Sequence, residues 1–149
     1  MKTNRIILAM AAVLMLGCAK ERIEEPMKPE TGDYIGTVTV IYQEQPFDNE
    51  DIEVNFEPSA DGATASITMR KIRFVPQMPV TIDVTIPDVK LASSPNEISL
   101  SCDEVIPLAM GGEYPRYKVT GLTGKLSGQN LEFSLKFGDY PTSYKGTRP

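Results

Sequence analysis

The side chains able to do chemistry in this 149-residue chain include two cysteines and twenty carboxylates, but no histidine. The chain therefore lacks the commonest general base, the commonest metal ligand and the usual partner of a nucleophilic serine or cysteine. We accordingly predict a protein that is not an enzyme, with no catalytic residues, no metal site and no cofactor.

Clustered carboxylates are the only groups that suggest catalysis. Asp48, Glu50 and Asp51 fall in one predicted loop, and Asp103 with Glu104 falls in another. Paired carboxylates can hydrolyse glycosides, and clustered ones can bind Ca²⁺ weakly. These sets follow no calcium-loop template and fit solvated turns more simply, so a carboxylate-based hydrolase is the least favoured alternative.

The two cysteines have different settings. Cys102 shares an apolar face with Ile98 and Leu100, which is typical of a buried small hydrophobe rather than an activated nucleophile. Cys18 directly follows an uncharged run of 12 residues, Ile6 to Gly17, which itself follows Lys2 and Arg5. That run is too short to span a membrane and matches the apolar core of an export signal.

The segment Met15-Leu16-Gly17-Cys18 resembles a lipobox, with methionine where leucine is usual. We therefore predict a lipoprotein signal peptide over 1–17 and lipidation of Cys18, which becomes the mature N-terminus. Several long acyl chains would anchor the protein to the outer membrane almost permanently. The charged residues after Cys18 resemble surface-export signals of Bacteroidetes lipoproteins, so both a periplasmic and a surface-exposed location in the cell envelope remain open.

The residues after Cys18 predict a linker and then one domain. Residues 18–32 are charged, contain two prolines and show no periodicity, which is typical of a flexible tether. Removing 1–17 takes away two basic and no acidic residues, so the formal net charge falls from −5 to −7. This spread negative charge argues against nucleic-acid binding. We expect residues 33–149 to form a single domain.

Alternation of apolar and polar residues dominates this domain and predicts half-buried strands. Asp61-Gly62 and Ser127-Gly128-Gln129-Asn130 are turn signals, and a change of parity near Arg70-Lys71 indicates a β-bulge. No amphipathic helix is evident. We expect eight strands, at about 34–43, 51–57, 63–74, 79–90, 97–102, 115–126, 130–138 and 142–147.

Eight short strands with hairpin connections favour a small antiparallel up-and-down β-barrel, because closure removes exposed strand edges. The outward positions carry charged side chains that would be costly against lipid, which disfavours a transmembrane barrel. The chain also resembles the calycin-like β-barrel domain of Bacteroidetes lipoproteins. The resemblance rests on strand and turn patterns at Tyr34–Val40, Asp61–Thr64, Phe74–Val84 and Gly121–Leu135.

This resemblance implies a lipocalin-like fold but no particular ligand and no catalytic residues. The lipocalin Gly-x-Trp signature is missing, since the chain has no tryptophan. An eight-stranded barrel can be filled by its own side chains or can hold one small ligand. The expected lining, which would form a ligand site in a hollow barrel, is Val38, Val40, Val54, Phe56, Ala63, Ala65, Ile67, Val84, Leu100, Phe133 and Leu135.

Two non-enzymatic functions follow from this lining. In the first, a hollow barrel binds a small apolar or amphipathic molecule. In the second, a filled barrel is a structural or interaction module that binds a protein or glycan through the loops around 44–50 and 103–116. Tyr114, Tyr117, Tyr140 and Tyr144 would then either stack on a sugar or pack against the barrel mouth.

Overall fold

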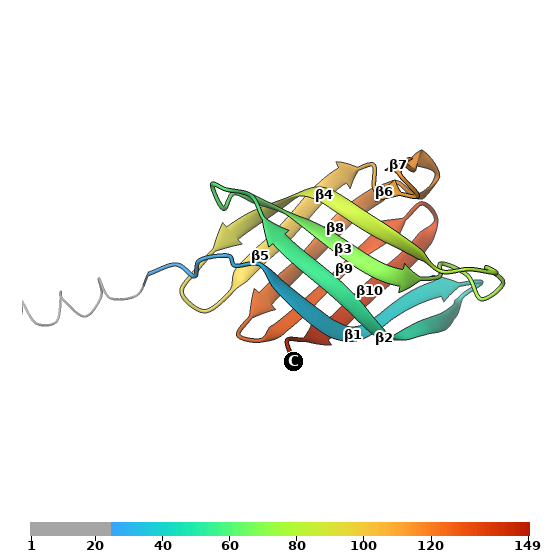
Figure 1. The fold of residues 1–149 in the computed structure, drawn as a ribbon, viewed down its shortest axis with the longest axis horizontal. Helices are drawn as coiled ribbons and strands as arrows, with labels where there is room; N and C mark the ends of the chain where they lie inside the picture. The colour runs from blue at the N-terminus through green and yellow to red at the C-terminus, as the bar shows by residue number, and fades with distance from the viewer. Residues whose placement is uncertain (1–24) are drawn as a thin grey trace, which may run out of the picture.

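The computed structural model describes residues 25–149, which form an antiparallel β-barrel (Figure 1). The predicted all-β class and the eight long strands are confirmed, and the described residues contain no α-helix. The long strands are β1 (Gly32–Tyr42), β2 (Gln45–Pro58), β3 (Thr64–Ile72), β4 (Ile82–Ser93), β5 (Ile98–Val105), β8 (Val119–Ser127), β9 (Asn130–Phe137) and β10 (Tyr140–Thr147). The short elements are β6 (Leu108–Ala109), β7 (Gly112–Glu113) and a single 3₁₀ turn, η1 (Pro115–Tyr117).

The long strands pair in the order β3-β2-β1-β10-β9-β8-β5-β4, and β3 also pairs with β4, which closes the barrel. Every pairing is antiparallel. Apart from β1 pairing with β10, neighbours in the barrel follow one another along the chain as an up-and-down meander. Closure gives each long strand two partners and places one face of every strand in the interior.

The up-and-down path gives the barrel two ends, which Figure 1 shows at opposite sides of the molecule. The proximal end holds the start of β1, the β2–β3, β4–β5 and β8–β9 turns and the C-terminus. The distal end holds the β1–β2, β3–β4 and β9–β10 connections and the segment from 106 to 118, which includes β6, β7 and η1.

Bulges decide which residues face the interior. The register of β3 against β4 shifts between Met69 and Ile72, and Lys71 has a φ of 56°. The bulge that the sequence predicts near Arg70-Lys71 is therefore confirmed. A second bulge, opposite the Gly36–Val38 part of β1, has Asp51 at a φ of 55° and reverses the parity of β2.

The second bulge corrects the expected loop at 44–50. Asp48, Glu50 and Asp51 belong to β2, which begins at Gln45 rather than at 51. Because the bulge breaks the alternation, Asn49 faces inward on one side of it and Ile52 on the other, and both are buried. The first half of this strand is therefore not recognised when a single alternating pattern is sought in the sequence.

Two further expectations are corrected. Residues 115–117 form the η1 turn instead of the start of β8, in keeping with a proline at the first position and the packing of Tyr117 against the barrel end. Ala63 is exposed and lies outside the interior, because β3 begins only at Thr64 and the Ala63 N–H donates to the Asp61 carboxylate at 3.0 Å.

Candidate functional site

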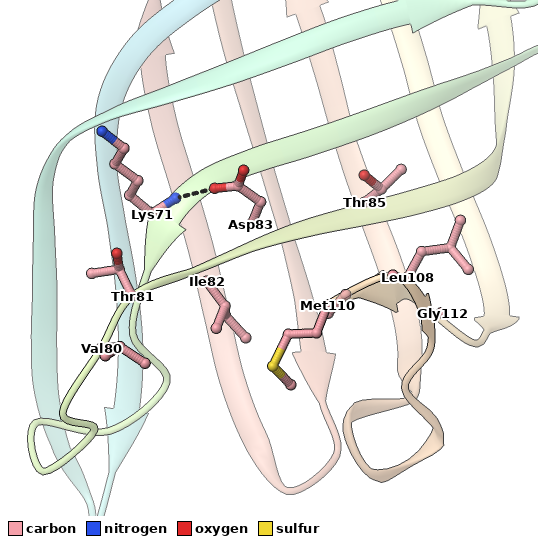
Figure 2. A pocket seen from close by; sticks show the side chains of 11 residues that line it. Lys71, Val80, Thr81, Ile82, Asp83, Thr85, Leu108, Met110 and Gly112 are labelled. Carbon is pink, nitrogen blue, oxygen red and sulfur yellow. Dashed lines mark hydrogen bonds between the residues drawn. The ribbon is translucent and has the colours of Figure 1, made fainter.

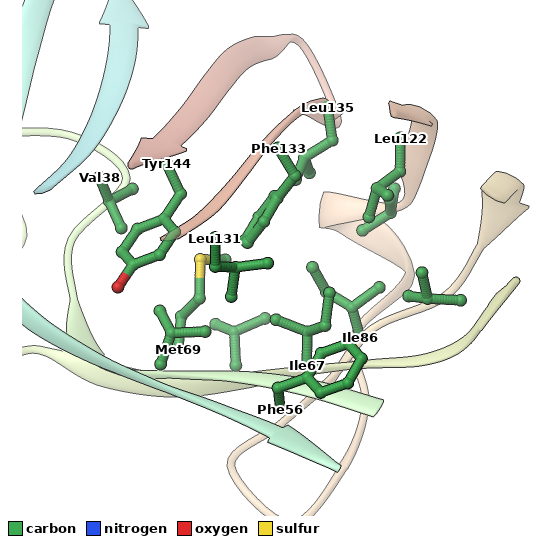
Figure 3. Packing of buried hydrophobic residues seen from close by; sticks show 14 of the residues in the cluster. Val38, Phe56, Ile67, Met69, Ile86, Leu122, Leu131, Phe133, Leu135 and Tyr144 are labelled. Carbon is green, nitrogen blue, oxygen red and sulfur yellow. The ribbon is translucent and has the colours of Figure 1, made fainter. Parts of the chain in front are cut away.

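The barrel interior is the first place to look for a site. Its expected lining is buried, apart from Ala63. The ten residues are between 0% and 6% exposed: Val38, Val40, Val54, Phe56, Ala65, Ile67, Val84, Leu100, Phe133 and Leu135. Figure 3 shows side chains from opposite walls meeting across the interior. A side chain that lined a water-sized cavity would keep accessible surface, so these values describe an interior packed by its own side chains.

Aromatic rings close the distal end of this interior. Phe74 packs edge-on to Phe137 at 4.9 Å between ring centroids, and Tyr117 stacks on Phe74 at 4.2 Å. Tyr114 stacks on Tyr117 at 5.1 Å, and the Tyr140 ring lies 6.1 Å from that of Tyr117. Since Tyr117 contacts three other aromatic rings and the Arg116 guanidinium lies 5.7 Å from its centroid, it packs on the end of the barrel rather than offering a free face to a ligand.

Tyr144, the fourth tyrosine that the sequence suggested for sugar stacking, does not belong to this distal aromatic group. Tyr144 is buried deep in the core, 1% exposed, with its ring 5.3 Å from that of Phe133. Its hydroxyl donates a long hydrogen bond of 3.5 Å to the Ile52 carbonyl, and burial raises its pKa far above the ordinary tyrosine value. Tyr144 is therefore a core residue.

A cation and an aromatic ring close the proximal end. The Arg148 guanidinium lies over the Tyr34 ring at 5.5 Å from its centroid, a cation–π arrangement. Tyr34 is 1% exposed and directly follows Gly32-Asp33 at the start of β1. Burial raises the pKa of the Tyr34 hydroxyl, while the charge of Arg148 opposes that rise. Both ends of the filled barrel are thus plugged by side chains.

Cys102 is confirmed as a buried thiol, 8% exposed on the interior face of β5. Burial raises its pKa, which disfavours the thiolate needed for nucleophilic attack. The sequence-predicted lipid site, Cys18, and the signal over 1–17 lie outside the described residues.

The clustered carboxylates are dispersed along strands. Asp48 accepts a hydrogen bond from the Thr39 hydroxyl at 2.7 Å, and Glu104 pairs with Lys118 at 3.2 Å, while Asp103 is exposed on β5. Within residues 25–149, no three acidic or cysteine side chains are arranged to hold a metal ion.

A groove on the outer wall at the distal end is the most distinctive surface feature. It has a volume of about 880 Å³ and lies between the β3–β4 connection and the β6–β7 hairpin (Figure 2). Val80, Leu108 and Met110 line it and are 62%, 40% and 69% exposed. Of the four large hydrophobic residues exposed in the described part of the chain, only Ile35 lies elsewhere. Gathering of exposed apolar side chains in one place is characteristic of binding surfaces.

The tip of the β6–β7 hairpin places Met110 in this groove. Met110 and Gly111 have φ values of 51° and 85°, as a tight two-residue hairpin turn requires. Asparagine or aspartate is usual at the first of these positions, and a methionine there costs conformational energy. Met110 is therefore an exposed apolar residue in an unfavourable backbone conformation. Such local conflicts between residue type and conformation are often found at functional sites.

The groove also borders a free strand edge. β6 pairs with β4 only through Val84 and Thr85. On that side, the first two residues of β4, Ile82 and Asp83, and Thr81 just before them have no partner strand among the described residues. An unpaired edge offers backbone donors and acceptors to an incoming extended chain.

Polar contacts fix the β3–β4 wall of the groove. Asn49 donates to the Arg73 carbonyl at 3.0 Å and accepts from the Arg73 N–H at 2.9 Å, which holds the start of the β3–β4 connection against the core. The Lys71 N–H donates to the Asp83 carboxylate at 2.9 Å across the β3–β4 pair (Figure 2). The floor at Ile82 is 9% exposed.

Sequence analysis included part of this groove in the loop around 103–116 but missed the hairpin and the β3–β4 wall. The Met110-Gly111 pair, which lies between two short segments able to form strands, was the available signal in the sequence.

The described residues include no helix long and apolar enough to cross a bilayer. In comparisons with known proteins, the chain has no significant match to a family model, a curated protein or a solved structure.

Proposed function

We propose that this chain is an envelope lipoprotein, lipidated at Cys18, whose filled calycin-like barrel acts without catalysis by binding an extended apolar segment of a partner protein. The groove beside β4, with Val80, Leu108 and Met110 exposed, is the observation that carries this proposal. The outer membrane is its proposed location, through the lipid on Cys18.

The interior supports an interaction module more than a carrier. A carrier needs a concave, largely preformed cavity, whereas the interior side chains are almost fully buried against one another. The aromatic cap at the distal end and the Tyr34–Arg148 plug at the proximal end leave no open mouth for a ligand to enter.

The chemistry of the groove favours a protein segment over a glycan. Its exposed apolar side chains are aliphatic or thioether groups, which fill apolar pockets. Of the tyrosines that would stack on sugars, three pack against one another at the distal end and Tyr144 is buried in the core. An extended peptide could also add to the free edge at Thr81–Asp83 through backbone hydrogen bonds. Methionine suits such a site because its flexible side chain adapts to the partner.

A crosslinking experiment in cells tests this proposal. A photoreactive residue at Val80 is expected to form a discrete protein adduct, and Met110→Asn is expected to remove most of it. Asparagine tolerates the positive φ of this turn, so Met110→Asn should keep or raise stability, by up to about 1 kcal/mol. Loss of binding without loss of stability would separate the groove's function from folding.

The matched control uses Ile35, the large exposed hydrophobic residue that lies outside the groove. A photoreactive residue at Ile35 should give no specific adduct, and Ile35→Asn should leave the Val80 adduct unchanged. Adducts of equal yield from both positions would contradict a specific groove, and an adduct with a glycan would contradict the proposed class of partner.

A fluorescent fatty-acid probe distinguishes the module from a carrier. The unmodified protein is expected to show no saturable binding across several amphipathic probes, because its interior is packed. Saturable binding that Ala65→Phe abolishes would overturn this expectation in favour of a hollow barrel. The enlarged side chain should cost about 1–3 kcal/mol of stability through overpacking, so folding is checked by circular dichroism.

A further inference from the structure

The segment that precedes β1 contacts the proximal end of the barrel. Residues 25–31 form neither helix nor strand, yet the Met27 N–H donates to the Ser94 carbonyl in the β4–β5 turn at 2.9 Å. The Met27 side chain packs against the core. Pro29 lies over the β2–β3 turn, where a Cβ on Gly62 would be 3.4 Å from the proline Cγ. We call residues 27–31 the strap.

The strap fixes the length of chain between the proposed lipid site and the first residue held on the barrel. Between Cys18 and Met27 the chain advances nine residues, which reach at most about 30 Å when fully extended. As a flexible coil, nine residues span only about 17 Å on average. Without the strap contacts, the fourteen residues from Cys18 to Gly32 would reach about 46 Å.

These lengths compare with the size of the barrel itself. β4 contains 12 residues and runs the whole way from the groove to the proximal end. At about 3.3 Å per residue and the usual barrel tilt, its two ends are separated by roughly 25–30 Å along the axis. Turning the groove toward the bilayer would require these nine residues to run almost fully extended past the whole barrel.

We propose that the strap holds the proximal end of the barrel next to the lipid headgroups and points the groove away from the membrane. This inference rests on the proposed lipidation of Cys18. The partner of the proximal end is thus the bilayer surface to which the chain is anchored, while a partner protein approaches the groove from the opposite side. The short tether imposes this orientation without needing an adhesive patch on the barrel.

Fluorescence quenching on vesicles tests the orientation. The full-length lipidated protein, with Cys102→Ala to remove the buried thiol, is reconstituted into phosphatidylcholine vesicles whose headgroups carry a quencher. A fluorophore is placed either at Asn96→Cys in the proximal β4–β5 turn or at Gln77→Cys in the distal β3–β4 connection, both exposed positions. Quenching at Asn96 is expected to be several-fold stronger than at Gln77, and equal quenching at both would overturn the orientation.

Two variants test whether the strap is the cause. Inserting about 20 glycine and serine residues between Cys18 and Met27 should lengthen the tether enough to remove most of the difference. The double change Met27→Gly with Pro29→Gly, which releases the strap contacts, should reduce the difference in the same direction. A difference that persists in both variants would overturn the role of the strap.

A Cys18→Ser control separates the two proposals. Without lipid, neither label should be quenched and the protein should not float with vesicles. If the unmodified protein also fails to associate, the anchor is wrong and the orientation falls with it. If it associates but both labels are quenched equally, the anchor stands and the orientation alone is wrong.

Discussion

Replacing Cys18 with serine is expected to abolish incorporation of radiolabelled palmitate and to release the protein from the membrane fraction. The physical reason is that serine offers no thiol for transfer of the diacylglycerol group. Each buried methylene of an acyl chain contributes about 0.8 kcal/mol to membrane binding, so two or three chains make the anchored state effectively permanent. Their loss should therefore change the location of nearly all of the protein.

The second cysteine is the matched control for this change. Cys102 lies buried in β5 and follows no signal-like sequence, so Cys102→Ala should leave palmitate labelling and membrane association intact. Labelling that continues in Cys18→Ser would contradict the lipid site, as would labelling that disappears in a folded Cys102→Ala protein.

Gly36→Ala is expected to destabilise the barrel strongly, by about 3 kcal/mol, because β1 and β10 approach too closely there to admit a side chain. A Cβ on Gly36 would overlap the carbonyl oxygen of Lys145 and the Cα of Gly146. These are backbone atoms of the paired strand, so relief requires the two strands to separate. Urea unfolding of the soluble chain beginning after Cys18 measures the effect.

A second glycine should behave in the same way. A Cβ on Gly124 would overlap the Glu132 carbonyl and the Cβ of Phe133, which pairs with Gly124 across β8 and β9. Gly112 is the control, since a Cβ there would meet nothing within 4 Å, and Gly112→Ala should change stability by less than about 0.5 kcal/mol. Equal effects at Gly36 and Gly112 would contradict close strand approach as the cause of the destabilisation.

The barrel was predictable because the information that specifies it is local. Ile52, Val54 and Phe56 alternate with polar neighbours, and a strand with one buried face has no other way to arrange them. The Asp61-Gly62 and Ser127–Asn130 turns were also evident, since Gly62 and Gly128 supply the positive φ values that tight turns need. Closure followed because eight strands without helices would otherwise leave two edges exposed.

Features that depend on distant contacts were not predictable. The bulge at Asp51 became visible only through its pairing opposite Gly36–Val38, so the first half of β2 appeared as a loop. The η1 turn accompanies the stacking of Tyr117 on Phe74, which lies 43 residues earlier in the chain. Tyr144 could be separated from the other tyrosines only once its strand was placed in the barrel.

The sequence by itself determined the class of fold and, apart from Ala63, the inward set of side chains, because alternation and turn residues are short-range patterns. The lipid site at Cys18 stays a prediction from a pattern of the same short-range kind. Tertiary structure decided that the interior is filled and that Val80 and Met110 share one groove. The first depends on how side chains from opposite walls interlock, and the second on a hairpin returning to the edge of β4, which lies more than twenty residues earlier in the chain. Neither relation leaves a local pattern in the sequence.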